Sequence, residues 1–367
     1  MIQLFYGNQQ QFRFRHNDIN ILGQSDTKLP VKRSVYRLNN GLAVHFYVEP
    51  EPEPGESKYP WGAHTPSVLR LNGRRGHFNI EIPINCPELQ AGGNNLSIEI
   101  EDMSGKVEML DTEFQWNPQP LPLPLSLSDL SAYQSIQEIG QVLNGAFDID
   151  YDKNVIRSRI PVVSDSLLLL GSPYGSQEAT YDVKFTSKKG IFIGLSDFFA
   201  GFEEQSPGLG IKPGYSTAGL ATIKPSGWAH AWIAKGDALM DKDWTWVLST
   251  EFPKQIAIQE GVTYSVRHQV IIAEGVNCVR YRIWPKGDLE PNQWLCDENN
   301  AYLNSKISRI TKASFGLFQH EGEPTEWSNI NVKPLDVNLK SLGLRQKNYR
   351  RKLQKTVRGI KSKLLNS

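Results

Sequence analysis

The chain has 367 residues, which is enough for two domains of ordinary size. Its 40 Lys and Arg balance 39 Asp and Glu, and the formal net charge of +1 gives no reason to expect a nucleic-acid partner. The amino-terminal segment lacks the basic and apolar regions of a signal peptide, so the sequence favours a cytoplasmic location, with export by a non-classical route left open. The longest apolar run, Leu167–Leu170, is far too short to span a bilayer.

Residues 1–117 are expected to form one all-β unit. Ser34–Leu38 and Phe78–Ile82 alternate apolar and polar residues, as half-buried strands do. Between strands, Asn39-Asn40-Gly41 predicts a hairpin turn, because Asn and Gly tolerate positive φ, and Leu42–Val48 is then the expected return strand. Short strands separated by frequent turn signals are typical of a β-sandwich.

One motif in this unit carries a family resemblance. The matching residues are Gly93, Asn95, Leu96, Asp102 and Gly105. In this spacing they resemble the last hairpin of bacterial immunoglobulin-like domains, which implies an immunoglobulin-like sandwich for residues 1–117. The resemblance further implies that Asn95 and Asp102 hold turns through hydrogen bonds from side chain to backbone.

Residues 118–126 contain alternating prolines, each of which restricts the preceding residue to extended conformations. This composition predicts a semi-rigid linker and places the domain boundary here. Residues 127–335 are expected to form a second all-β domain, with alternating strands at Tyr181–Phe185 and Trp228–Ile233.

The second domain also resembles a known family. Its features are the hairpin Tyr264–Trp284, the loop Trp284–Trp294, the strand at Gly316–Phe318 and the closing strand Trp327–Val332. Together they resemble the laminin-G-like or concanavalin A-like jelly roll. The resemblance implies a two-sheet sandwich with a concave face, and the tandem order resembles a bacterial two-domain arrangement. That fold hosts lectin modules, glycoside hydrolases, polysaccharide lyases and adhesion domains, so it does not choose among functions.

An aromatic strand provides the first ligand-binding candidates. Trp228, His230 and Trp232 alternate with alanines, so they are expected to share one face of a strand. Indole rings stack on the apolar C–H faces of sugars, and an imidazole can bond to sugar hydroxyls. Packing in the core is the alternative for the same three residues. Asp197, Arg282 and Trp284 are further candidates for the concave face.

Catalysis and metal binding have weaker support. His268, Tyr281 and Arg282 offer the residue types of a polysaccharide lyase, a base and a group that neutralises a uronate. Asp148, Asp150 and Asp152 alternate along one strand end, where crowded carboxylates could hold Ca²⁺; otherwise no cofactor is predicted. The three cysteines have no zinc-site spacing, although Cys278 and Cys296 could pair with each other.

Residues 336–367 differ in composition from the rest of the chain. They are rich in Lys and Arg, and Lys340–Lys363 contains no Asp or Glu. Leu353, Val357 and Ile360 recur at helical spacing, so the segment is predicted to be a basic amphipathic helix or a disordered basic tail. A solvated or docked tail and one that touches an anionic membrane or polymer remain alternatives.

The sequence therefore predicts an all-β protein whose function is non-catalytic binding of an oligo- or polysaccharide. The second domain would bind through the concave face and loops of the jelly roll. A glycoside hydrolase or polysaccharide lyase acting in the same cleft is one alternative, and a structural or adhesion protein is another. The sequence leaves the oligomeric state open.

Overall fold

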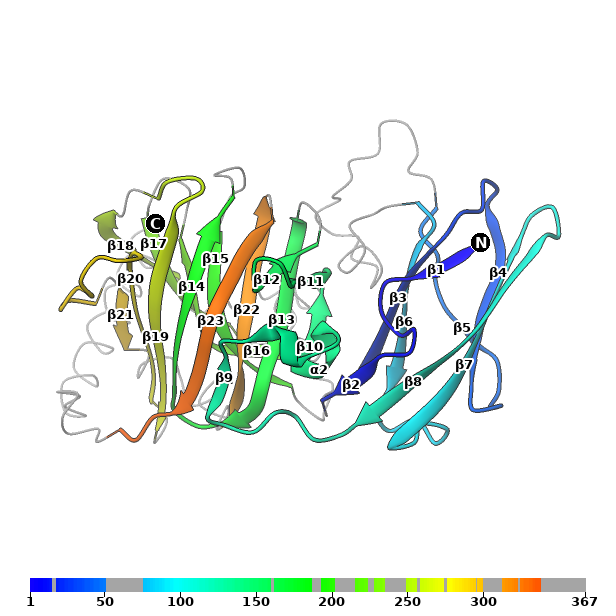
Figure 1. Cartoon of the computed structure of the whole chain (residues 1–367), viewed down its shortest axis with the longest axis horizontal. Coiled ribbons are helices and arrows are strands. Elements are labelled where there is room, and N and C mark those ends of the chain that lie inside the picture. Colours follow the sequence, from blue (N-terminus) through cyan, green and yellow to red (C-terminus); the bar gives the residue numbers. More distant parts are fainter. Residues whose placement is uncertain are drawn as a thin grey trace, which may run out of the picture.

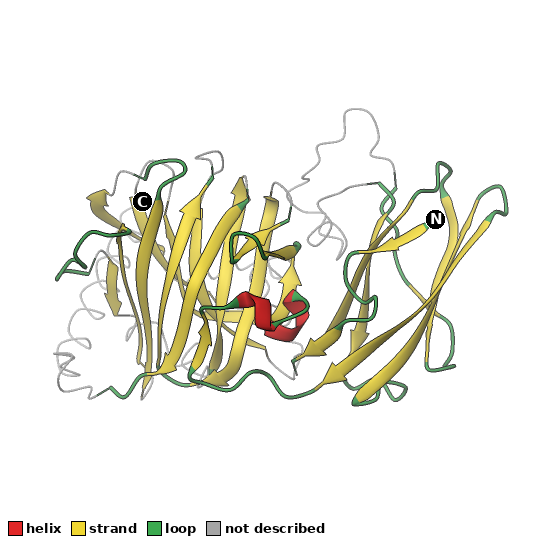
Figure 2. Cartoon of the chain, viewed as in Figure 1, coloured by secondary structure: helices red, strands yellow, loops and turns green. Residues whose placement is uncertain are grey.

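The computed structural model describes residues 1–14, 18–50, 75–159, 162–186, 193–201, 215–223, 228–234, 249–255, 258–273, 276–294, 296–299, 312–322 and 324–337. This part of the chain forms four β-sheets, with one short α-helix and one 3₁₀ turn (Figure 2). The predicted all-β fold is confirmed. No helix among these residues is both long and apolar enough to cross a membrane.

Two sheets are built from residues 1–117. A three-stranded sheet contains, in spatial order, β1 (Ile2–Leu4), β3 (Asp18–Ser25) and β6 (His77–Pro83). A five-stranded sheet contains β2 (Gln11–Arg13), β8 (Val107–Asn117), β7 (Gly92–Asp102), β4 (Val31–Leu38) and β5 (Val44–His45). Apolar side chains of both sheets are buried, among them Ile21, Ile80, Ile98 and Phe114, so these strands pack around a shared apolar core.

The predicted turn after β4 is present, but its return strand is shorter than expected. Asn39 and Asn40 have positive φ angles of 48° and 64°. The chain then pairs with β4 only at Val44 and His45, and Val48 bridges to Phe78 of the other sheet. The predicted strand Leu42–Val48 is wrong in extent, because its second half leaves β4 for the opposite layer.

The β7–β8 hairpin corrects one role implied by the immunoglobulin-like motif. Asp102 does hold its turn: its Oδ1 accepts hydrogen bonds from the backbone N–H groups of Ser104 (2.9 Å) and Lys106 (3.2 Å). At the other end, however, the buried residue is Asn94 rather than Asn95. The Asn94 side chain donates to the carbonyls of Gln90 and Gly92 and accepts from the Gln90 N–H (2.7, 3.0 and 2.9 Å).

Replacing Asn94 is therefore expected to cost more than replacing its neighbour. Asn94→Ala removes three part-buried hydrogen bonds between this side chain and the backbone of the Gln90–Gly92 turn, so the free energy of unfolding should fall by about 1–3 kcal/mol. Asn95→Ala, at an exposed position, should change it by less than about 0.5 kcal/mol. Urea unfolding of the two variants checks this, and equal losses would contradict it.

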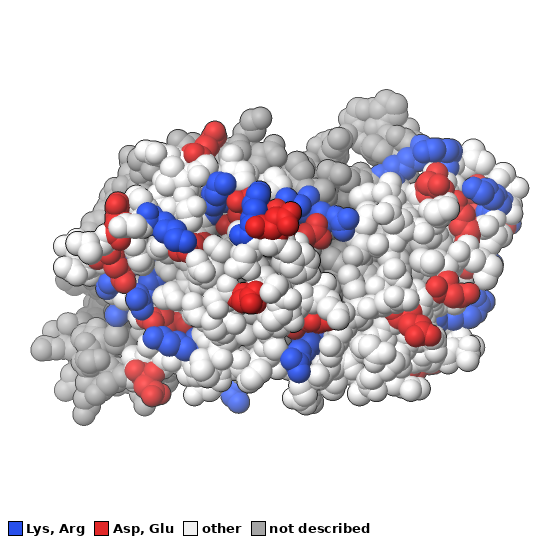
Figure 3. Space-filling model, viewed as in Figure 1, with Lys and Arg blue, Asp and Glu red and all other residues white. Residues whose placement is uncertain are grey.

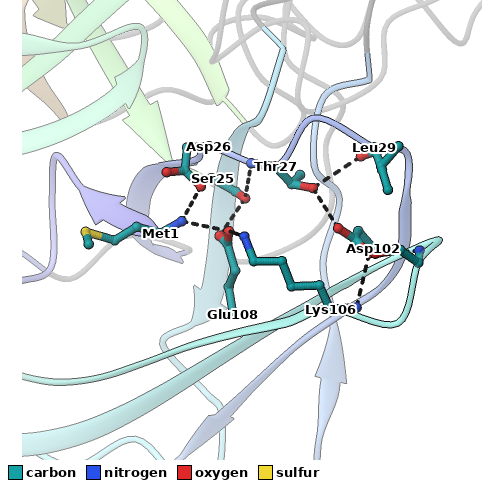
Figure 4. A network of polar contacts seen from close by, with 9 residues as sticks. Met1, Ser25, Asp26, Thr27, Leu29, Asp102, Lys106 and Glu108 are labelled. Carbon is teal, nitrogen blue, oxygen red and sulfur yellow. Dashed lines mark hydrogen bonds and ion pairs between the residues drawn. The ribbon is translucent and has the colours of Figure 1, made fainter.

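A polar network ties the start of the chain to this hairpin (Figure 4). Glu108 is almost fully buried, and its carboxylate accepts from the Ser25 hydroxyl (2.9 Å) and contacts the Met1 amine (2.7 Å) and Lys106 (3.3 Å). Thr27 donates to the Asp102 carboxylate at 3.4 Å. The Ser104 hydroxyl, with the turn N–H groups, lowers the pKa of Asp102 despite the opposing effect of burial.

Two larger sheets are built from the rest of the chain and lie face to face (Figure 1). The seven-stranded sheet has the order β10 (Gly140–Asn144), β13 (Val162–Tyr174), β22 (Ala313–Gly322), β15 (Ile193–Gly201), β16 (Tyr215–Ile223), β17 (Trp228–Ala234) and β18 (Ser249–Gln255). The eight-stranded sheet has the path β11 (Phe147–Asp150), β12 (Val155–Ser158), β23 (Thr325–Pro334), β14 (Gln177–Phe185), β19 (Thr263–Ala273), β20 (Val276–Pro285) and β21 (Cys296–Asn299), and β9 (Leu125–Leu127) pairs with β23.

The core between these sheets is aromatic. The rings of Tyr181 and Phe315, from opposite sheets, lie 5.8 Å apart. Phe147 packs against Trp327, which is completely buried. The predicted hairpin Tyr264–Trp284 is the β19–β20 pair, in continuous antiparallel register from Tyr264–Pro285 to Ala273–Val276.

The proline-rich segment is packed rather than free. Leu121 and Leu125 are buried, and the Leu121 carbonyl accepts hydrogen bonds from both the N–H (2.8 Å) and the hydroxyl (3.0 Å) of Ser172. The last residues of the predicted linker enter β9, whose Leu125 pairs with Val332 of β23. The prediction of a spacer is therefore wrong for Leu121–Ser126, because its leucines belong to the apolar core of the following sandwich.

A seam of buried polar contacts joins the two pairs of sheets. Beside it, β2 lies against α2 (Ile136–Ile139) and β10 (Figure 1). The Tyr6 hydroxyl donates to the Phe147 carbonyl (2.7 Å) and accepts from the Phe147 N–H (2.5 Å). Asn20 Nδ2 donates to the Val142 carbonyl at 2.8 Å. Directional bonds between buried groups fix how the two parts sit against each other.

Candidate functional site

The predicted binding residues fall on both sheets of the second sandwich. Trp228, His230 and Trp232 lie on β17, and Asp197 lies on β15, all in the seven-stranded sheet. Arg282 and Trp284 lie on β20 in the eight-stranded sheet. The six residues therefore do not form one surface. The sequence could not show this, because both strands alternate in the same way.

Strand register brings Asp197 and Trp232 into one row of the seven-stranded sheet. Leu169 pairs with Gly316, Gly316 with Asp197, Asp197 with Leu220, and Leu220 with Trp232. Since neighbouring strands lie about 4.8 Å apart, the Cα atoms of Asp197 and Trp232 are about 10 Å apart. His230 is two residues from Trp232 on the same strand. These positions were far apart in sequence, and only the register joins them.

Leu169, at the start of this row, shows on which face of the seven-stranded sheet the row lies. Leu168 and Leu170 belong to the main core between the two sheets. Leu169 alternates with them and instead lines a pocket together with Arg13, Phe14 and Gln141. The Leu169 side chain is thus on the face turned away from the eight-stranded sheet, which we call the outer face of the seven-stranded sheet.

This pocket lies at the junction of the two pairs of sheets. Its volume is about 10 Å³, and it is lined by Arg13, Phe14, Pro120, Ile139, Gly140, Gln141, Leu169, Gly171 and Ser314. Phe12 and Phe14 face the core of the first pair of sheets, so the alternation of β2 turns Arg13 the other way. Sequence reasoning missed Arg13, because nothing near residue 13 indicates contact with residues 139–141.

Arg282 belongs to a separate charged cluster on the outer side of the eight-stranded sheet. Glu290, in the loop after β20, accepts a paired hydrogen bond from Arg267 (2.8 and 3.0 Å) and another from Arg282 (2.8 Å). Glu178 accepts from Arg267 (2.8 Å) and from Gln269 (2.6 Å). Figure 3 shows positive and negative side chains interspersed over this face.

Electrostatics in this cluster favour the charged forms. Burial acts to raise the pKa of Glu178, but hydrogen bonds from Gln269 and Lys333 and the charge of Arg267 hold that pKa below its ordinary value. Hydrogen bonding to Arg267 likewise lowers the pKa of Glu290. The Arg282 guanidinium lies 4.0 Å from the centre of the Trp294 ring. These groups satisfy one another, so the cluster holds the loop against the sheet.

The residue types that suggested a lyase are not assembled. His268 and Tyr281 are both completely buried between the sheets, with ring centroids 6.3 Å apart. Arg282 alternates with Tyr281 on β20, and its bond to Glu290 is on the other side of the sheet. Burial lowers the pKa of His268 to about 3. A base enclosed in the core, with the cation on the opposite face, cannot act on one sugar.

The carboxylates proposed for Ca²⁺ are engaged by cations. Asp148 pairs with Arg159 (3.5 Å), and Asp150 pairs with Arg157 (3.4 Å) and Lys153 (3.7 Å). Asp152 follows in the turn after β11. Among the described residues, no three His, Cys, Asp or Glu side chains gather as metal ligands do.

The two remaining predictions concern Cys278 with Cys296 and the basic segment. Cys278 pairs with Asn299 and Cys296 with Tyr281, so the cysteines are offset by three residues along β20 and β21. At about 3.3 Å per residue, this offset alone is about 10 Å, beyond the roughly 7 Å that a disulfide spans between Cα atoms. The predicted helix or tail of residues 336–367 lies outside the described residues from 338 onward.

Comparisons with known proteins give fold-level likenesses only. No family model and no curated protein matches the chain. The carbohydrate-binding module CBM66 from Bacillus subtilis is similar over 53% of this chain and 95% of its own, at 12% identity and a TM-score of 0.35. A legume lectin-like domain from Entamoeba histolytica is similar over 59% and 96%, at 9% identity and a TM-score of 0.37.

A third similar structure is an enzyme. The alginate lyase vAL-1 from Chlorella virus is similar over 54% of this chain and 93% of its own, at 9% identity and a TM-score of 0.35. With TM-scores this low, none of the three decides what this chain does.

Proposed function

We propose that the chain is a non-catalytic carbohydrate-binding protein, and that it binds its ligand across the outer face of the seven-stranded sheet. The observation that carries this proposal is the row in which Asp197 and Trp232 lie two strands apart, with His230 nearby. An extended row across five strands has the length of several sugar rings. We also propose that residues 1–117 form an immunoglobulin-like sandwich. Residues 127–335 would then form a laminin-G-like or concanavalin A-like jelly roll.

The residue types in this row suit a sugar. A pyranose has an apolar face of C–H groups that stacks on an indole ring, and stacking excludes water from both surfaces. Its hydroxyls need hydrogen-bond donors and acceptors at the ring edge, which a carboxylate and an imidazole supply. The alternative surface, around Glu178 and Glu290, is less suited because its charges already bind one another.

A glycan array tests the proposal directly. The wild type is expected to bind one class of glycan, and Trp232→Ala and Trp228→Ala should weaken that binding about tenfold or more, because each removes one stacking surface. Trp284→Ala is the matched control, since Trp284 lies in the other sheet. Absence of binding by the wild type to every glycan would refute the proposal, as would loss of binding in Trp284→Ala alone.

A further inference from the structure

Among the arginines that the structure describes, Arg13 differs from those whose guanidinium pairs with a carboxylate. Arg33, Arg37, Arg157, Arg159, Arg267 and Arg282 each pair with a carboxylate. Arg75 donates to the carbonyl of Lys28, and Arg280 also has an interaction. In the part of the chain that the structure describes, the Arg13 side chain makes no hydrogen bond and no ion pair, although its Nε is buried. A part-buried guanidinium without a counter-ion is costly, and an anion would offset that cost.

Among the described residues, the pocket around Arg13 contains no Asp or Glu that could pair with the guanidinium. Two other polar side chains line it: Ser314 Oγ donates to the Gly171 carbonyl (3.1 Å), and Gln141 Nε2 donates to the Asp18 carbonyl (3.0 Å). With a volume of about 10 Å³, the pocket admits a group about the size of one water molecule, such as a carboxylate oxygen, and no complete sugar ring.

The pocket also lies in line with the proposed binding face. Gln141 pairs with Leu169, and both line the pocket. The same row continues through Gly316 and Asp197 to Trp232. From Leu169 to Trp232 the row crosses four strand spacings, about 19 Å, which is the length of roughly four sugar residues. The amino-terminal sheets therefore place a cation at one end of the face.

We propose that Arg13 binds the carboxylate of an acidic sugar residue, a uronate, at the junction end of the ligand. This inference rests on the proposed function and names the ligand class. A guanidinium matches a carboxylate by a pair of parallel hydrogen bonds, so the contact selects the acid over its uncharged ester. It also gives the amino-terminal half a direct part in recognition, because the binding surface is incomplete without β2.

Calorimetric titration with two matched oligosaccharides tests the proposal. Tetragalacturonate is the acidic probe, and its fully methyl-esterified form is the uncharged control of the same length. The wild type should bind the acid at least tenfold more tightly than the ester. Arg13→Gln should abolish that preference while leaving ester binding unchanged, and Arg13→Lys should retain part of it because the charge remains without the planar fork. Arg37→Gln, in the same five-stranded sheet, is the matched control and should bind like the wild type.

Each outcome decides the proposal. Equal binding of acid and ester by the wild type, binding of neither, or unchanged preference in Arg13→Gln would overturn it. So would equally tight, Arg13-dependent binding of a hexaglutamate peptide, which would assign the pocket to acidic peptides. Trp232→Ala distinguishes failure of the Arg13 contact from failure of carbohydrate binding. If Trp232→Ala weakens binding of acid and ester alike while Arg13→Gln has no effect, the chain binds carbohydrate but Arg13 does not contact the uronate. If Arg13→Gln is unfolded, the acid-to-ester ratio of Arg13→Lys decides.

Discussion

Lowering the pH from 6.5 to 4.5 should remove about 2 kcal/mol of stability through His268 alone. In the folded protein burial lowers the pKa of His268 to about 3, whereas the unfolded chain has the ordinary value of 6.5. Between these values the unfolded state takes up a proton that the folded state does not. The stabilisation is therefore complete well above pH 6.5 and is lost as the pH falls toward 3, at up to about 1.4 kcal/mol per pH unit midway between the two values.

Between pH 6.5 and 4.5 the change in stability comes mainly from His268, because the carboxylates lose their contribution at lower pH. Glu178 and Glu326 also have lowered pKa values, despite the opposing effect of burial, because of hydrogen bonds from Gln269 and Lys153. Their stabilisation is present above their unfolded value of 4.5 and is lost only below it.

Urea unfolding at pH 6.5, 5.5 and 4.5 measures the effect. His268→Gln has no titrating ring, so its stability should vary less over this range than that of the wild type, by about 2 kcal/mol, whatever its stability at pH 7. His45→Gln, at an exposed position, should behave as the wild type does. Equal pH dependence in His268→Gln and the wild type would show that His268 is not held neutral in the core.

Removing one hydroxyl at the seam should loosen the two halves of the molecule. Tyr6→Phe leaves both the N–H and the carbonyl of Phe147 buried without the partner that Tyr6 supplied. Each such group costs about 1–3 kcal/mol, so we expect the two together to lower the free energy of unfolding by about 2–6 kcal/mol. Hydrogen exchange should locate the loss, with faster exchange at residues 140–147 and little change within β19 and β20.

Tyr36→Phe is the matched control for this change. Tyr36 is also buried within the first pair of sheets, but no hydrogen bond of its hydroxyl crosses the seam in the described structure. Its loss of stability should therefore stay near 1 kcal/mol or below, without altered exchange at residues 140–147. If the two variants behaved alike, the seam would depend on apolar packing and not on the Tyr6 hydroxyl.

The strands of this chain were predictable because apolar and polar residues alternate in the sequence as buried and exposed side chains alternate along a strand. β19 alternates buried and half-exposed residues from Tyr264 to Val270, and β20 does so from Arg280 to Ile283, with the period that the sequence shows. Turn chemistry was less certain. Asn94 and Asn95 are adjacent and identical, so only the backbone path reveals which amide faces the Gln90 turn.

The site was harder to predict than the fold, because register cannot be derived from one sequence. Asp197 and Trp232 lie on strands separated by β16, and their row depends on bulges between Gly194 and Ser196 and between Thr217 and Leu220. A shift of one residue would place different pairs together. The pocket around Arg13 could not be predicted for a related reason, because most of its lining residues are more than a hundred positions away in the sequence.

The pairing of β9 with β23 has a consequence for how this molecule could be rearranged. Leu125, where the chain enters the second sandwich, lies beside Val332, near the end of β23, which is the last strand in the described part of the chain. A domain whose two termini are close together can be circularly permuted, or inserted into a loop of another protein, without distortion of its backbone. The boundary for such a transfer lies before Leu121 and not after Ser126, since the leucines between them fill the sandwich that would be moved.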